Sequence, residues 1–465
     1  MAPGVVAGIV CVAFVLVELL VLDARVRDYD EGVYWQSIAA IARGEPLFTS
    51  VFASQPPGFY YALLPFYLLG HSIVSMRLAV LAFGLVGLGG SYLAGRLIGG
   101  PIAGLIALFL AATSPLYVHQ SAIVQADGPS VAGSMMAVAL ALVAVRSDGR
   151  AGLACAAFAG LVFAFAVGIK LVGVVAAIPI ALVVLGAPRR RLSLIVAVLG
   201  GAIVGVAVVL IPAMAAPGAA FDQLVLAHLR AGQATGQSVG ANALVLFLHR
   251  EEPLEALALI GVVVALLRRN VSIVMPVVWA AASVLAVLFY HPLFPHHVVM
   301  LSLAFALTAA VGLSSKPRPA VPQRERELFD LTAGALVLAT AVAGIAVVAG
   351  DIRLARVPDL HNAEMIAAVQ STGVADDVWI SDNPYAVGAA GRSIPGPLVD
   401  TSGQRIRAGL LTVLDLEATR QRYRVRWVLE DSFRLYAVPN YQGWLAAHFH
   451  AVRQLGGSAV IYQTN

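Results

Sequence analysis

The chain has 465 residues, of which 60% are hydrophobic and only 12% are charged, and its formal net charge is +4. Soluble domains carry about 25% charged residues, so this composition excludes an ordinary soluble protein. The sequence also lacks a basic patch of the kind that binds nucleic acid. The two cysteines, Cys11 and Cys155, both fall in apolar runs, which excludes a disulfide framework and a cysteine metal site.

Apolar runs recur along the first 350 residues, each close to the roughly 20 residues that a helix needs to cross a bilayer. We predict eleven spans, at 4–22, 72–95, 101–119, 128–145, 152–168, 171–187, 193–213, 253–267, 272–290, 298–313 and 329–350. The first run lacks a basic segment before it and a small-residue cleavage site after it, so we expect it to be retained. Residues 1–350 are thus predicted to form a polytopic α-helical membrane domain.

Basic residues gather in alternate loops between these spans: Arg96; Arg146 and Arg150; Arg189, Arg190 and Arg191; Arg268 and Arg269; Lys316, Arg318, Arg324 and Arg326. Cytoplasmic loops carry the excess of Lys and Arg, so these loops and the amino terminus are predicted to be cytoplasmic. Arg25 and Arg27 oppose this orientation but are outnumbered. We expect a bacterial plasma (inner) membrane, because the Arg-rich, Lys-poor composition is typical of bacteria with GC-rich genomes.

The first outer loop, residues 23–71, has the most site-like composition. It places three acids within four positions, Asp28, Asp30 and Glu31, and then continues as a helix. It ends in Gln55-Pro56-Pro57-Gly58, followed by Phe59, Tyr60 and Tyr61. Acids, a double proline and aromatic side chains at a span end predict a polar site held against the membrane surface.

Three further residues at span ends are candidates for the same site. An acid at membrane depth costs about 2.5–3.5 kcal/mol, so Asp127, before the fourth span, is either functional or paired; alternatively it is a solvated helix cap. Lys170, one of only two lysines, lies in a short outer turn, where it needs an anion such as a phosphate unless it snorkels to water. Arg77, near the outer end of the second predicted span, has the same two interpretations: contact with an anion such as a phosphate, or snorkelling to water.

The adjacent His296 and His297 follow a proline-punctuated turn. They could bind a metal or a phosphate, although adjacent helical residues do not face the same way, so one site would use one of them. The alternative is a structural hydrogen-bonding role. With Asp127 they are the candidate ligands of a divalent metal ion.

Residues 351–465 change in composition and predict a small extracytoplasmic α/β domain. Strands are expected at 377–382, 424–430 and 459–463, and helices at 359–371 and 441–454. Arg420, Arg422, Arg424 and Arg426 alternate, which on a strand would place them on one face, either solvated or facing a polyanion.

Clustered acids at a membrane surface can perform general-base chemistry if a nearby cation stabilises a leaving phosphate. Asp30 is the candidate base, and Asp28 or Glu31 could orient the acceptor or hold a metal. Because the outer face lacks ATP and nucleotide sugars, a lipid-linked donor is expected. The sequence has no phosphate-binding loop, serine-hydrolase elbow or zinc-protease motif.

The Asp30-Glu31 pair, the helix that follows it to Gly44, and Pro56-Pro57 with Tyr60-Tyr61 resemble the GT-C membrane glycosyltransferases. The lipid A aminoarabinose transferases and protein O-mannosyltransferases (glycosyltransferase families 39 and 83) are the most similar. The resemblance covers the topology of residues 1–350 and is most specific in the first loop.

This resemblance implies a GT-C fold, a polyprenyl-phosphate sugar donor, and inverting transfer of a hexose or pentose to an envelope lipid, glycan or protein. It implies Asp30 as the catalytic acid with Glu31 beside it, and Asp127 as the second acid; some members use a divalent metal. Ser54-Gln55 stands where the aminoarabinose transferases have Glu-Lys, and Val33 replaces their arginine. Gln55, Lys170, Arg77 and His296 are therefore the candidate donor-phosphate ligands, and Tyr60, Tyr61 and Asp28 the candidate acceptor or loop residues.

Two other classes of function stay open: a transporter or flippase of lipid-linked sugars, and a non-catalytic envelope assembly subunit. A transporter needs ionisable groups near the midplane, whereas the polar residues here gather at the outer face, which favours the enzyme. Because the Glu-Lys pair of the aminoarabinose transferases is missing, the non-catalytic assembly subunit stays an alternative.

Overall fold

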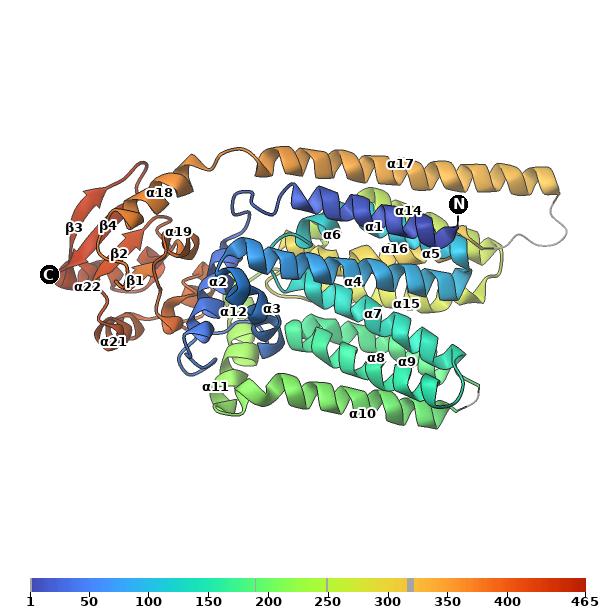
Figure 1. Cartoon of the computed structure of the whole chain (residues 1–465), viewed down its shortest axis with the longest axis horizontal. Helices are drawn as coiled ribbons and strands as arrows, with labels where there is room; N and C mark the ends of the chain where they lie inside the picture. The colour runs from blue at the N-terminus through green and yellow to red at the C-terminus, as the bar shows by residue number, and fades with distance from the viewer. Residues whose placement is uncertain (1, 189, 248–249, 316–321) are drawn as a thin grey trace.

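The computed structural model describes residues 2–188, 190–247, 250–315 and 322–465. An elongated helical bundle carries a small sheet domain at one end (Figure 1). The bundle helices are α1 (Pro3–Leu19), α4 (Ile73–Gly99), α5 (Pro101–Thr113), α6 (Pro115–Gln120), α7 (Asp127–Arg146), α8 (Gly149–Ile169), α9 (Ala177–Leu185), α10 (Arg191–Leu210), α14 (Glu252–Leu267), α15 (Val274–Leu288), α16 (Val299–Leu313) and α17 (Gln323–Ala355).

Each of the eleven predicted spans coincides with helix in the structure. Among the described residues, seven segments are long and apolar enough to cross a membrane: Ile73–Gly99, Asp127–Arg146, Gly149–Ile169, Arg191–Ala213, Val271–Leu288, Pro295–Leu313 and Gln323–Gln370. Pro3–Leu19, Pro101–Thr113 and Leu171–Leu185 are shorter apolar helices. The polytopic helical class is confirmed, whereas the count of eleven spans stays a prediction.

The two ends of the bundle differ in chemistry. α1 and α17 begin, and α4 and α7 end, at the end far from the sheet domain (Figure 1), where the last turns of α4 and α7 carry Arg96 and Arg146. The acidic first loop lies at the opposite end. Arg189, Lys316 and Arg318 lie outside the described residues. Arg96 and Arg146 thus lie at the end opposite the acidic loop, and the cytoplasmic assignment of that end stays a prediction.

The first outer loop forms two helices, α2 (Tyr29–Ala42) and α3 (Pro57–Gly70). The Asp28 side chain caps α2 by accepting a hydrogen bond from the Asp30 N–H. Pro57 begins α3, where its missing N–H costs nothing because the first turn has no partner for it. From Glu31 to Ile41, α2 is buried on every side, so it belongs to the core rather than to an interface.

The C-terminal domain covers α2. Its helix α19 (Pro384–Ala389) packs on α2, and a Cβ on Gly32 would lie 2.5 Å from the Tyr385 nitrogen. Glycine is therefore required at position 32 by the close approach of two backbones. One hydrophobic core includes Trp35 and Ile38 of α2 together with Trp379 and Val428 of the sheet.

The sheet has the order β1-β2-β4-β3, with β1 (Trp379–Ser381) parallel to β2 (Trp427–Glu430) and β4 (Val460–Thr464) antiparallel to β2 and to β3 (Phe449–Gln454). Its helices include α18 (Leu360–Gln370), α20 (Gly403–Arg407), α21 (Val413–Tyr423) and α22 (Tyr441–His448). The predicted small α/β domain is confirmed. The proposed boundary at residue 350 falls inside α17, which continues to Ala355.

Two predicted elements of this domain are wrong. The helix expected at 441–454 ends at His448, and residues 449–454 form β3. Arg420 and Arg422 lie on α21, which continues to Tyr423, and Arg424 is its left-handed C-cap with φ 51°. The alternating arginines therefore share no strand face, because their positions follow a helical turn before the strand begins.

The segment between the predicted spans 193–213 and 253–267 is mostly helical. It forms α11 (Pro217–Phe221), a π-helical turn η3 (Asp222–Leu226), α12 (Ala227–Thr235) and α13 (Val239–Phe247). Gln223 of η3 donates to the Phe48 carbonyl and accepts from the Ala53 N–H, which attaches this segment to the first outer loop.

Candidate functional site

Glu31 and Arg77 form a buried ion pair beneath the first loop. Arg77 Nε and Nη2 donate to the Glu31 carboxylate at 2.8 and 2.7 Å, and both side chains are 0% exposed. Arg77 also donates to the carbonyls of Leu22 and Ala24, and Glu31 accepts from the backbone N–H groups of Arg27 and Val124. Burial alone would raise the pKa of Glu31, but Arg77 and these hydrogen bonds outweigh it and the pKa is lowered. Every polar atom of the pair is thus committed to holding the loop on the bundle.

Asp28, the N-cap of α2, and Asp30, directly before Glu31, are less enclosed than Glu31. Both side chains are partly exposed. Burial raises the pKa of Asp28, which lies with Oδ2 4.0 Å from His296 Nδ1. Burial and the negative charges of Asp28 and Asp400 raise the pKa of Asp30 well above its usual range. A carboxylate with a raised pKa is a stronger base than an ordinary one, which suits removal of a proton from a hydroxyl.

Asp127 and Lys170 form a second ion pair. Lys170 Nζ donates to both carboxylate oxygens of Asp127 at 2.7 Å, and both side chains are buried. Asp127 is the first residue of α7, and Lys170 is the residue after α8, so antiparallel neighbouring helices bring them together. Of the two sequence interpretations of Asp127, the paired one describes the structure.

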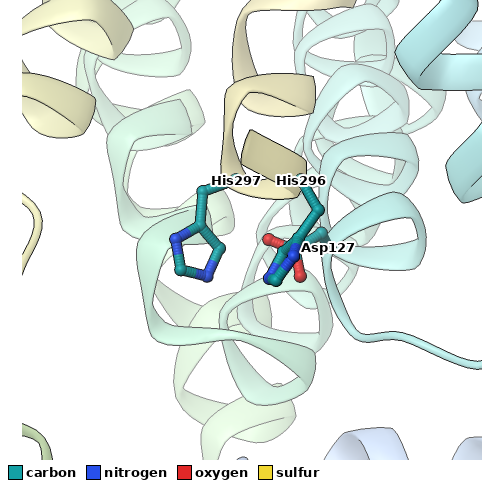
Figure 2. A group of neighbouring side chains, drawn as sticks. All are labelled: Asp127, His296 and His297. Atoms are coloured by element: carbon teal, nitrogen blue, oxygen red, sulfur yellow. The ribbon is translucent and has the colours of Figure 1, made fainter. Parts of the chain in front are cut away.

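His296 and His297 lie beside this pair, in the 3-10 turn η5 (Pro295–Val298) that precedes α16. One ligand atom from each of Asp127, His296 and His297 lies within 4.8 Å of the others (Figure 2). The two rings are 4.4 Å apart between centroids. Both histidine rings lie near Asp127, because the two residues occupy a tight turn rather than an α-helix. His297 Nδ1 also accepts a hydrogen bond from the Phe294 N–H at 3.2 Å.

A cavity of about 510 Å³ opens on one side of these residues. Its polar wall contains Ser54, Gln55, Lys170 and His228, and its apolar wall contains Leu171, Leu224, Leu229 and Phe289. Phe289 and Leu229 are largely exposed on the bundle surface, so the apolar wall continues to the membrane-facing side. We call this the apolar cavity.

A second cavity, of about 500 Å³, lies on the other side and is lined by several charged side chains as well as apolar ones. Its lining includes Arg25, Arg27, Asp28, His119, Arg250, His296 and Asp351. Arg250 is paired with Asp351, and Arg27 Nη2 donates to the Ala122 carbonyl. We call this the polar cavity. Lys170, Asp127, His296 and Asp28 form a continuous line of polar side chains from the apolar cavity to the polar one.

The remaining predicted residues are dispersed. Gln55 lines the apolar cavity beside Lys170. Tyr60 is buried in an aromatic cluster with Tyr34 and Phe59, and Tyr61 is partly exposed on α3. The structure thus brings Asp28, Asp127, Lys170 and His296 together, and it places Glu31, Arg77 and Tyr60 in the supporting core.

Sequence reasoning missed Arg27 and His228 as lining residues. His228 reaches the apolar cavity from α12, in the segment between two predicted spans. Arg27 carried a usable signal, because a basic residue on the outer side of a span departs from the charge rule and so indicates another use.

Known proteins resemble this chain in sequence over one segment and in fold over its whole length. Residues 54–214 match the family of dolichyl-phosphate-mannose-protein mannosyltransferases. No curated protein matches the chain by sequence.

Three solved structures illustrate the shared fold. ArnT from Cupriavidus metallidurans bound to undecaprenyl phosphate is 15% identical, with a TM-score of 0.70 over 99% of this chain and 98% of that one. The oligosaccharyltransferase AglB from Archaeoglobus fulgidus, solved with an inhibitory peptide and a dolichol-phosphate, is 14% identical with a TM-score of 0.57, over 99% and 74% of the two chains. A complex of the Archaeoglobus fulgidus oligosaccharyltransferase with Zn and sulfate has a TM-score of 0.56 at 14% identity, over 99% and 73%.

The expected resemblance is confirmed: the chain has the fold of the GT-C membrane glycosyltransferases.

Proposed function

We propose that the chain transfers a sugar from a polyprenyl-phosphate donor to a hydroxyl-bearing acceptor of the cell envelope, on the outer face of the membrane. The observation that carries this proposal is the line of polar groups joining an apolar, membrane-side cavity to a polar one. A lipid-linked sugar has the same two-part character, a hydrocarbon chain with a charged phosphate at its end. The solved ArnT and AglB complexes with lipid phosphates support this choice of donor.

The donor is assigned to the apolar cavity. Its isoprenoid chain would lie against Leu224, Leu229 and Phe289, where burial of apolar surface contributes about 25 cal/mol per Å². Its phosphate would meet Lys170, with Gln55 beside it as a hydrogen-bond donor. A lysine behaves as a point charge toward phosphate, so its ammonium group can stabilise the negative charge that develops on the leaving group.

The acceptor is assigned to the polar cavity, where Asp28 faces the solvent-filled space. In the transfer, Asp30 removes the acceptor's hydroxyl proton while the oxygen attacks the anomeric carbon. The bond from that carbon to the phosphate oxygen breaks, and the polyprenyl phosphate leaves with the electron pair. Attack from the face opposite the phosphate inverts the anomeric centre.

A divalent ion at Asp127, His296 and His297 is the alternative source of positive charge for the phosphate. It would compete with Lys170 for the Asp127 carboxylate.

Purified protein supplied with radiolabelled polyprenyl-phosphate sugars and envelope extract tests the proposal. We expect transfer in the wild type and its loss in Asp30→Asn, because an amide cannot accept the proton. Asp148→Asn, the same change at an exposed position near the opposite end of the bundle, is the matched control and should transfer normally. Equal transfer by Asp30→Asn and wild type would refute the assigned base, and movement of the lipid-linked sugar across vesicles without transfer would favour a flippase.

A further inference from the structure

The carboxylate of Asp127 is already held by a cation that belongs to the chain. Lys170 Nζ lies 2.7 Å from both oxygens, and its side chain is almost completely buried. A metal such as zinc binds carboxylate oxygen at about 2.0–2.2 Å. An ion at that distance would lie against the ammonium group, with two positive centres in contact. The Asp127 carboxylate can therefore serve the ion or Lys170, but not both.

His297 is a second poor ligand in its observed position. Its Nδ1 accepts the Phe294 N–H. When one nitrogen of a neutral imidazole accepts, the other carries the hydrogen, so Nε2 offers no lone pair to a metal. Protein-bound catalytic zinc usually has three protein ligands. With Lys170 on Asp127 and Phe294 on His297, the three gathered residues do not fit a divalent ion.

We propose that the ammonium group of Lys170 fills the position at Asp127 that a divalent ion would take, so that the chain binds no such ion there. The catalytic consequence rests on the proposed function: one lysine balances Asp127 at rest and faces the donor phosphate during transfer, because it lines the apolar cavity as well. Removing the ammonium group should then free the Asp127 carboxylate to bind a divalent ion together with His296.

Cobalt(II) binding to the purified full-length protein tests this directly, because its visible absorption reports bound ligands without any sugar donor. We expect no specific spectrum in the wild type and binding at least about tenfold tighter in Lys170→Met, since a like charge in contact has been removed. Lys170→Met combined with Asp127→Asn should lose that binding. Equal binding by wild type and Lys170→Met would overturn the proposal, as would the absence of binding in a folded Lys170→Met.

Wild-type protein provides an independent measurement if Lys170→Met does not fold. We expect no stoichiometric zinc after purification, and no change in melting temperature or transfer when EDTA is added. Bound zinc whose removal lowers the melting temperature would overturn the inference. Because metal content is read separately from transfer, a chain that transfers nothing can still confirm or refute the role of Lys170 at Asp127.

Discussion

The two buried ion pairs of this chain are built from the same kinds of charge but have different surroundings. Glu31–Arg77 lies in the core, with no exposed surface and with five further hydrogen bonds to backbone groups. In the second pair, Lys170 lines the apolar cavity and Asp127 lies beside His296. Because every polar atom of the Glu31–Arg77 pair already has a hydrogen-bond partner, this pair is part of the structural scaffold. The Asp127–Lys170 pair has a cavity of ligand size on one side, so Lys170 can change its partner when a ligand binds.

The largest expected effect comes from breaking the scaffold pair. Arg77→Met would leave Glu31 buried without its partner, which typically costs about 3–5 kcal/mol in the free energy of unfolding. We expect little monodisperse protein by size-exclusion chromatography in detergent and a strongly lowered melting temperature. Arg96→Met changes an exposed arginine of the same helix and should behave as wild type. An Arg77→Met variant as stable as this control would show that the two pairs do not differ as described.

Breaking the cavity pair should affect transfer more than folding. Lys170→Met is expected to lower kcat by about 10²–10³-fold, the usual cost of losing one group that stabilises developing negative charge. Its melting temperature should fall less than that of Arg77→Met, because water in the cavity can solvate Asp127. Lys170→Arg keeps the charge and should retain part of the activity. A rise in KM with unchanged kcat would instead indicate that Lys170 contributes only to donor binding.

The smallest expected effect concerns Asp28 and Asp30, the two acids at the start of α2. Burial, and then the charge of Asp28, raise the pKa of Asp30. In Asp28→Asn the second contribution disappears, so the pKa of Asp30 falls and its carboxylate stays ionised at lower pH. The acid limb of the kcat/KM profile should therefore move to lower pH. Asparagine is also a good N-cap, so α2 should keep its stability, and an unmoved limb would argue against Asp30 as the base.

Local sequence pattern was sufficient for the helical framework. A helix satisfies its own backbone groups in a bilayer, so each apolar run of sufficient length leaves a readable signal whatever packs against it. The acids of the first loop were likewise predicted at a polar end of the bundle. In the C-terminal domain the signal was weaker, and alternation from Arg420 to Arg426 indicated a strand where α21 continues to Tyr423.

The partners of the charged residues could not be predicted in this way. Arg77 and Lys170 looked alike in sequence, as cations at span ends that need an anion. Their acids are 46 and 43 residues away along the chain, so only the packing of helices decides that one pair is enclosed and the other borders a cavity. A rule that a buried cation pairs first with an acid of its own chain would have predicted that both cations are paired, although not with which acid.

The contact between Gly32 and Tyr385 has a consequence for how this protein could be re-engineered. Because there is no room for a side chain at the crossing, α2 and the C-terminal domain fit each other as a matched set. A chimaera that imports a foreign C-terminal domain would have to import the α2 that fits it, and with it the acidic residues at the start of that helix. The C-terminal domain and the acidic residues of α2 would then be exchanged together.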